Sequence, residues 1–134
     1  MLVLALLTLL SCLNPIFGKI ASISAPSIIP AGKNFTVVIH TTSYIQNWDD
    51  FGIIFGLKSP NLTSDPIAVG DEIGYSNLYG VEKLPNVTVS VSCPIWASGK
   101  YTLVGAVPYL VGASGETGIQ YFNQSISVTP TPAK

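Results

Sequence analysis

Apolar and polar residues alternate over short stretches of this chain, and clusters of Gly, Pro, Asn and Ser separate the stretches. Such alternation has the period of a half-buried β-strand. The predicted strands are ASISA from Ala21, FTVVIHTT from Phe35, FGIIFGL from Phe51, a weaker one over 73–78, VTVSVSC from Val87, YTLVGAV from Tyr101 and IQYFNQSISV from Ile119. After the first eighteen residues no stretch has the period and length of a convincing amphipathic helix. The pattern predicts an all-β protein.

Seven short strands with a turn signal about every 8 to 12 residues are typical of an immunoglobulin-like or fibronectin-like β-sandwich. Two interdigitating apolar faces would form its core without help from a disulfide. The predicted core residues are Phe35, Val37, Ile39, Phe51, Ile53, Phe55, Val89, Val91, Leu103 and Ile126.

The first residues form a predominantly aliphatic run over 2–10 that small and helix-breaking residues follow. The run is shorter than the roughly 20 apolar residues of a membrane span but has the length of a signal-peptide core. Cleavage after Gly18 would leave a single sandwich domain over 19–128 and an extended Thr/Pro tail over 129–134. A lipoprotein signal with Cys12 as acceptor is the rival interpretation. We therefore predict a secreted, extracellular protein without a stable membrane anchor.

Cysteine usage supports the absence of a disulfide. Removal of the signal also removes Cys12, so Cys93 becomes the only cysteine of the mature chain. Because Cys93 continues the apolar positions of its strand, we interpret it as an inert core thiol. A nucleophile would need a base beside it, and the sole histidine, His40, lies on the polar side of another strand.

Four Asn-X-Ser/Thr sequons begin at Asn34, Asn61, Asn86 and Asn123, where chance would give only one or two. In three of them strand alternation places the Asn and the Ser/Thr together on a polar face. Accidental sequons among polar strand residues remain the alternative. If the sites are used, the protein passes through a eukaryotic secretory pathway.

Few groups in the sequence can carry chemistry. Asp49 and Asp50 are adjacent, and adjacent strand residues point to opposite faces, so the pair is better explained as part of a turn than as an acid/base dyad. No metal-ligand cluster, phosphate-binding loop or nucleophile motif is present, so we predict no cofactor and no enzyme. The chain has no arginine and no basic run, which argues against nucleic acid as a partner.

Trp48 and Trp96 are the remaining candidates. Together with Asp49 and Asp50 they form the predicted interaction surface, on the hypothesis that the tryptophans are exposed. Buried tryptophans at the ends of the sandwich are the alternative.

Several short motifs occur in one order over nearly all of the mature chain. They are AG at 31–32, YIQ at 44–46, IIFG at 53–56, GKY at 99–101 and GAS at 112–114. With these motifs the chain resembles the necrosis-inducing secreted protein family of fungal effectors. The resemblance implies a non-catalytic protein that suppresses plant pattern-triggered immunity by binding host immune receptor-associated kinases. It leaves open whether the protein acts outside host cells or enters them. An extracellular carbohydrate-binding module that contacts a cell-wall glycan is the alternative hypothesis.

Overall fold

The computed structural model describes residues 17–132, and nine strands and one short 3₁₀ turn make up the regular structure of this part of the chain. The strands are β1 (Phe17–Ser24), β2 (Ile28–Pro30), β3 (Asn34–Tyr44), β4 (Trp48–Asp50), β5 (Gly52–Lys58), β6 (Asp71–Asn77), β7 (Asn86–Ser92), β8 (Gly99–Val111) and β9 (Glu116–Thr129). The 3₁₀ turn η1 (Pro60–Leu62) lies in the loop between β5 and β6. The greater part of the predicted signal, including Cys12, and the last two residues of the tail lie outside the described residues.

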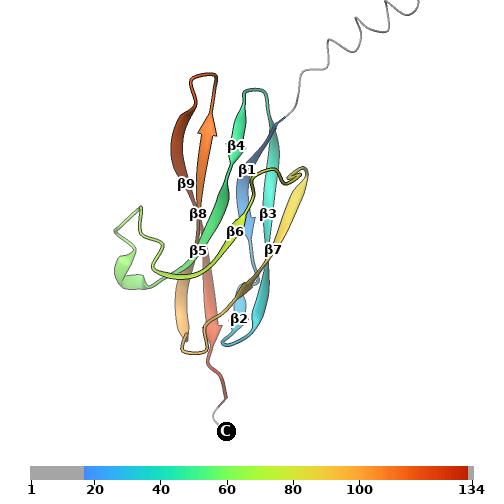
Figure 1. The fold of residues 1–134 in the computed structure, drawn as a ribbon. Coiled ribbons are helices and arrows are strands. Elements are labelled where there is room, and N and C mark those ends of the chain that lie inside the picture. The colour runs from blue at the N-terminus through green and yellow to red at the C-terminus, as the bar shows by residue number, and fades with distance from the viewer. Residues whose placement is uncertain (1–16, 133–134) are drawn as a thin grey trace, which may run out of the picture.

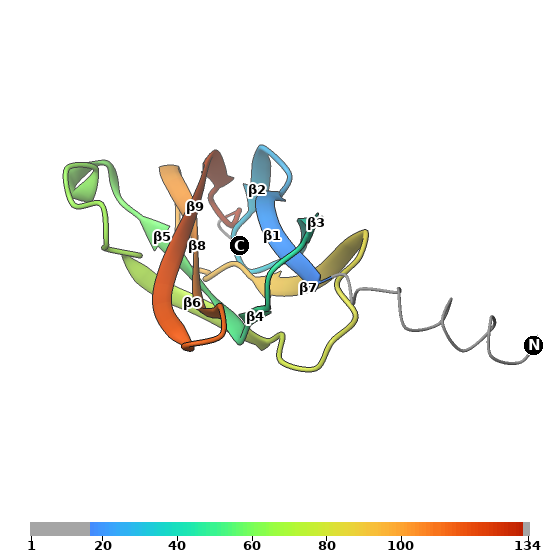
Figure 2. The ribbon, with the colours of Figure 1, turned by 90° about the horizontal axis from the view of Figure 1, so that it is seen from above.

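The strands form two layers, which Figure 2 shows side by side (Figures 1 and 2). One layer is a three-stranded sheet in the order β1-β3-β7. The other is a six-stranded sheet in which β2-β9-β8-β5-β6 are neighbours and β4 pairs with β8. The β2–β9 pair is parallel, whereas the other pairs are antiparallel. The predicted β-sandwich is confirmed.

All seven predicted strands are present, and β2 and β4 are additional short strands. The core is the set of apolar side chains that the two sheets direct toward each other, with Phe55, Ile53, Leu57, Val37 and Ile39 fully shielded from solvent. Of the predicted core residues, Val89 is half-buried at the margin of the core. Phe51 is also half-buried, but it stacks on Tyr79 instead of entering the core.

A bulge between β4 and β5 explains the position of Phe51. From Asp50 to Ile54 the chain takes four steps, while the paired residues of β8, Tyr109 to Ala106, take three. The extra residue reverses which side chains face the core on the N-terminal side of the bulge. Consequently Asp50 points inward, and Phe51 leaves the alternation that begins at Ile53.

Gln124 connects the layers where the chain passes from β1 to β2 and so changes sheets. Its Oε1 accepts a hydrogen bond from Ala25 N at 2.8 Å, and its Nε2 donates to Ala25 O at 2.7 Å. The side-chain amide thus replaces the strand neighbour that Ala25 lacks at the crossing, which satisfies both of its backbone groups.

Cys93 follows β7 and is buried as a free thiol, with 2% of its surface exposed. Burial raises the pKa of the thiol. The predicted core position of this cysteine is confirmed. The described residues include no helix of the length and apolar character that a membrane crossing requires.

Candidate interaction surface

The outer face of the six-stranded sheet carries a row of apolar side chains in register across four strands. Tyr121 on β9 pairs with Ala106 on β8, Ala106 with Ile54 on β5, and Ile54 with Tyr75 on β6. These residues alternate with the core-facing ones, so they lie on the opposite, outward face. In the adjoining row Pro108 pairs with Ile119. We call the six residues Tyr121, Ala106, Ile54, Tyr75, Pro108 and Ile119 the apolar stripe.

The stripe is open to solvent at both ends. Tyr75 is 59% exposed and Ile119 is 53% exposed, Ile54, Pro108 and Tyr121 are half-buried, and Ala106 between Tyr121 and Ile54 is buried, with 3% of its surface exposed. The solvent face of an antiparallel sheet is ordinarily polar. A contiguous apolar strip on such a face is typical of a protein interaction surface.

The other sheet shows the ordinary arrangement. On β7 the outward residues are Asn86, Thr88, Ser90 and Ser92, whereas the valines between them face inward. The contrast between the two outer faces distinguishes the apolar stripe from the general surface of the molecule.

Glycines and a loop define the limits of the stripe. A Cβ atom on Gly52 would overlap the ring of Tyr75, so the absence of a side chain there allows the ring to lie on the sheet. At the other end, the β5–β6 loop folds back over the sheet, and a Cβ atom on Gly56 would overlap the carbonyl group of Val69. The stripe is therefore most exposed at Tyr75 and Ile119, and the β5–β6 loop covers the sheet beyond Gly56.

Sequence reasoning missed this surface, although a signal for it exists. The segments GIIFGL in β5 and LVGAVPYLV in β8 are apolar without interruption. A strand with one solvent-exposed face would instead alternate apolar and polar residues. A continuous run indicates a strand whose two faces are both apolar.

The structure corrects the predicted surface around Trp48. Trp48 is 6% exposed, and Asp50 is fully buried. The bulge before β5 turns both side chains into the sandwich, so they are unavailable to a partner and Asp50 is no turn residue. Asp49 lies between them, half-buried and directed to the other face, as adjacent strand residues must be. Asp49 and Asp50 therefore do not form a pair.

Asp50 is held by two donors from different parts of the fold. Trp48 Nε1 donates to its Oδ1 at 2.8 Å, and the backbone N of Ile20 on β1 donates to its Oδ2 at 3.1 Å. Desolvation by burial raises the pKa of Asp50, against the smaller opposing effects of these two bonds and of Lys83 and Lys19. The carboxylate connects the two sheets and has no access to a substrate.

An aromatic cluster surrounds this carboxylate. The Trp48 ring stacks on Tyr109, with 4.4 Å between centroids, and meets Tyr44 edge-on at 5.3 Å. Lys19 Nζ lies 4.1 Å from the centre of the Trp48 ring, a cation–π contact that covers the end of the sandwich. The cluster is structural.

Trp96 differs from Trp48 in both exposure and place. It is 58% exposed in the loop between β7 and β8, just before β8 begins, whereas Trp48 pairs with Val111 at the far end of the same strand. The two tryptophans therefore do not form a common platform. Of the two tryptophans only Trp96 is exposed and available to a ligand.

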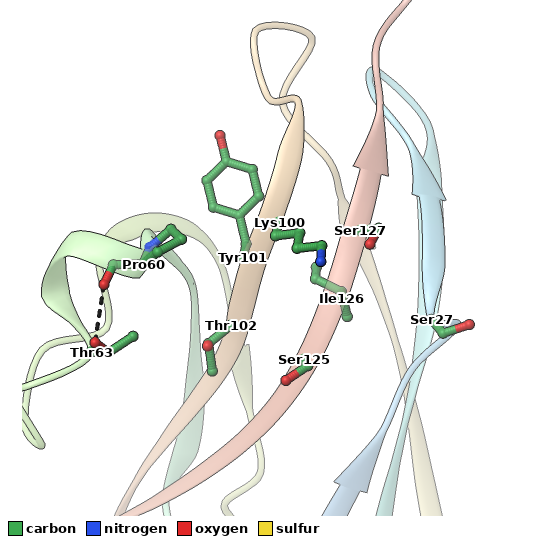
Figure 3. A pocket seen from close by; sticks show the side chains of 9 residues that line it. All are labelled: Ser27, Pro60, Thr63, Lys100, Tyr101, Thr102, Ser125, Ile126 and Ser127. Carbon is green, nitrogen blue, oxygen red and sulfur yellow. Dashed lines mark hydrogen bonds between the residues drawn. The ribbon is translucent and has the colours of Figure 1, made fainter.

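An open pocket of about 420 Å³ lies where η1 approaches β8 and β9 (Figure 3). Its polar lining consists of hydroxyl groups, among them Thr63, Thr102 and Ser125, together with the single cation of Lys100. It contains no carboxylate or imidazole that could act as a general base. Within residues 17–132 no group of three or more His, Cys, Asp or Glu side chains is placed to hold a metal ion.

All four sequon asparagines, Asn34, Asn61, Asn86 and Asn123, are exposed. The Ser or Thr two residues after each one is exposed as well. Asn34 and Asn86 belong to the three-stranded sheet, Asn123 lies on β9, and Asn61 lies in η1. Each site is sterically open to a glycan.

The structure is a small β-sandwich whose six-stranded sheet carries an apolar stripe on its outer face. The chain belongs to the Nis1 family, whose family model matches residues 17–127. It is 30% identical over 114 residues to necrosis-inducing secreted protein 1 of Colletotrichum higginsianum, covering 83% of this chain and 78% of that protein. The protein of the same name from Colletotrichum orbiculare is 26% identical over 116 residues, covering 83% and 70%. The family resemblance found in the sequence is confirmed, and the names of the relatives support a secreted effector with an extracellular location.

Among solved structures, the fold is similar to superoxide reductase (neelaredoxin) from Ignicoccus hospitalis. The TM-score is 0.51 at 15% sequence identity, over 84% of this chain and 81% of that one. A variant of the same reductase gives a TM-score of 0.51 at 16% identity, over 89% and 85%. At this level of identity the likeness concerns the fold alone.

Proposed function

We propose that this protein is a non-catalytic secreted effector that binds a host plant protein through the apolar stripe. The observation that carries the proposal is the in-register row from Tyr121 to Tyr75 on a face that would ordinarily be polar. A row of this kind on the outer face of a sheet fits the surface of a folded protein, because small-molecule sites are concave and enclose their ligands. Tyrosines at both ends of the row supply amphipathic anchors of the kind found at interface hot spots.

The proposed partners are host immune receptor-associated kinases, and the proposed outcome is suppression of pattern-triggered immunity. This partner class is what the family resemblance found in the sequence implies, while membership of the Nis1 family supports the coarser statement of a secreted effector. The burial of Asp50, which leaves that carboxylate without access to a substrate, also favours binding over catalysis as the mode of action.

The proposed route includes a cleaved signal peptide and N-glycosylation before release. The exposure of all four sequons supports glycosylation. Strand β1 begins at Phe17, two residues before the predicted mature terminus at Lys19, so cleavage after Gly18 would leave most of β1 in place.

Binding of the glycosylated mature chain to purified kinase domains of plant immune receptor complexes tests the proposal. A double variant, Tyr75→Ala with Ile119→Ala, removes two exposed side chains of the stripe, and we expect it to weaken binding at least about tenfold, or 1.4 kcal/mol. Trp96→Ala is the matched control, because Trp96 is as exposed as Tyr75 but lies outside the stripe. We expect it to bind as the wild type does.

Two outcomes would contradict the proposal. The first is wild-type binding no stronger than that of an unrelated secreted β-sandwich. The second is equal binding by the double variant and the wild type.

A further inference from the structure

The free edges of the two sheets are protected in different ways. An edge strand presents unpaired backbone groups that can pair with a second chain, and proteins prevent this with charges, Pro, bulges or very short edge strands. Among the described residues β1, β7, β2, β4 and β6 each pair with one strand only. Strand β9 pairs with β8 along nearly its whole length but with β2 only over Ser127–Thr129, so its second edge has no strand partner over residues 116–126.

Edges other than that of β7 carry features of this kind within the chain. In β1 an extra residue, Ala21, interrupts the register with β3. In β6 an extra residue, Ile73, interrupts the register with β5, and Asp71 and Glu72 add charge. Strands β2 and β4 are three residues long; β2 ends at Pro30, and β4 contains two aspartates. The free part of β9 begins with the charged Glu116, and Gln124 within it binds Ala25 between β1 and β2.

Strand β7 has none of these features. It pairs with β3 over all seven residues, Asn86 to Ser92, without a register shift. Its sequence NVTVSVS contains no charge and no Pro, and it alternates valines with small polar residues. A strand of this composition is a good template for pairing with a second copy of itself.

Two of the four sequons lie on this sheet. Asn86 is the first residue of β7 itself, and its sequon continues to Thr88 on the same outward face. Asn34 lies on the adjacent β3, where it pairs with Ser92 at the opposite end of β7. Glycans at these two sites would therefore stand at both ends of the β7 edge, which carries no charge, no Pro and no register shift.

We propose that N-glycans on Asn86 and Asn34 protect the β7 edge from pairing with another copy of the protein. An N-glycan is bulky and hydrated, so one attached on the edge strand sterically opposes the approach of a second strand. The proposal rests on the glycosylated secretory route described above, but it concerns self-association and not host binding.

The test compares chains secreted by a glycosylating eukaryotic host. Peptide mapping by mass spectrometry should find glycan on Asn86 and Asn34. Thr88→Ala combined with Thr36→Ala removes both sequons while it keeps both asparagines, and we expect this variant to form dimers and larger species in light scattering as its concentration rises. Thr88→Ser with Thr36→Ser keeps both sequons and should remain monomeric. Asn61→Gln with Asn123→Gln removes the other two glycans and should remain monomeric as well.

A rescue variant separates edge pairing from poor folding. Ser90→Lys, placed on the outward face of β7 in the sequon-free chain, should restore the monomer because an edge lysine opposes strand pairing. Unmodified Asn86, or a sequon-free chain that stays monomeric at every concentration, would overturn the proposal. Association that persists in the Ser90→Lys chain would also overturn it. No host protein is present in these measurements, so their result is independent of kinase binding.

Discussion

Trp48 and Asp50, two residues apart on β4, are joined by a 2.8 Å hydrogen bond from the indole Nε1 to Oδ1 of the carboxylate. The second carboxylate oxygen accepts from the backbone of Ile20 in the opposite sheet. A buried carboxylate with two donors is satisfied without a salt bridge, and its removal would leave two buried N–H groups without an acceptor. Asp50 is therefore part of the connection between the layers.

Asp50→Asn should destabilise the fold by about 1–3 kcal/mol. The amide oxygen can replace one carboxylate oxygen, but the amide NH₂ then faces the other N–H donor. Urea unfolding followed by tryptophan fluorescence measures the loss. Asp49→Asn is the matched control and should change the free energy of unfolding by less than about 0.5 kcal/mol. Equal stability of the two variants would remove the proposed role of Asp50.

The pH dependence of stability should carry the signature of Asp50. Because burial raises its folded-state pKa above the unfolded value of about 3.9, the folded protein binds the proton more tightly. The stabilisation of the fold by this proton on Asp50 is therefore complete below the unfolded pKa, and it is lost as the pH rises through the folded pKa. The free energy of unfolding of the wild type, measured relative to Asp50→Asn, should increase as the pH falls from 7 toward 4. A constant difference across this range would contradict the assignment.

Gln124 and Gln120 form a natural comparison on the inward side of β9. Gln124→Met removes both hydrogen bonds to Ala25 and should cost about 1–3 kcal/mol. The buried Oε1 of Gln120 has no hydrogen-bond partner within residues 17–132, so Gln120→Met should be neutral within about 0.5 kcal/mol or stabilising. Thermal and urea unfolding of the two variants provide the test. A larger loss for Gln120→Met than for Gln124→Met would refute this account of the sheet crossing.

Gly52 and Gly56 lie on the same outward face of β5 but have different neighbours. A methyl group at Gly52 meets the end of the exposed Tyr75 side chain, which can turn away. Gly52→Ala should thus change stability by less than about 1 kcal/mol while it displaces a stripe residue and weakens host binding. At Gly56 the methyl group meets the Val69 carbonyl, and Gly56→Ala should cost about 1–3 kcal/mol. Unfolding curves distinguish the two, and the reverse order of stability would contradict this geometry.

Cys93 should react with iodoacetamide only when the protein opens. The thiol is 2% exposed and its pKa is raised by burial, so the reactive thiolate is both scarce and inaccessible. The labelling rate should fall below that of the unfolded chain by the ratio of unfolded to folded molecules. Mass spectrometry across a urea series measures it. Rapid labelling in the absence of urea would contradict the buried position.

The sequence predicted the strands well because most of them bury one face and expose the other. Alternation in VTVSVS and FTVVIH identifies the core side of β7 and β3 directly. Strand β2 was missed since three residues are too few to show a period. The free core cysteine was predictable for the same reason as the strands, because Cys93 continues the apolar positions of β7.

The sequence placed the residues around Trp48 wrongly, and the cause is one bulge. Simple alternation backward from Phe55 and Ile53 puts Phe51 in the core and Trp48 and Asp50 on the opposite face. The extra residue opposite β8 reverses this assignment, and no Gly or Pro pair in NWDDFG marks it. The apolar stripe depends on which residues of four strands are in register, which a single strand cannot reveal.

The bulge before β5 also has a consequence for how this surface can evolve. The one extra residue of the bulge determines which side chains around Trp48 face the core. Loss of a single codon there would therefore exchange the buried and the exposed side chains of the whole segment. Substitutions change such a surface one side chain at a time. A change in length at this point would present a tryptophan and a carboxylate to the exterior in a single event.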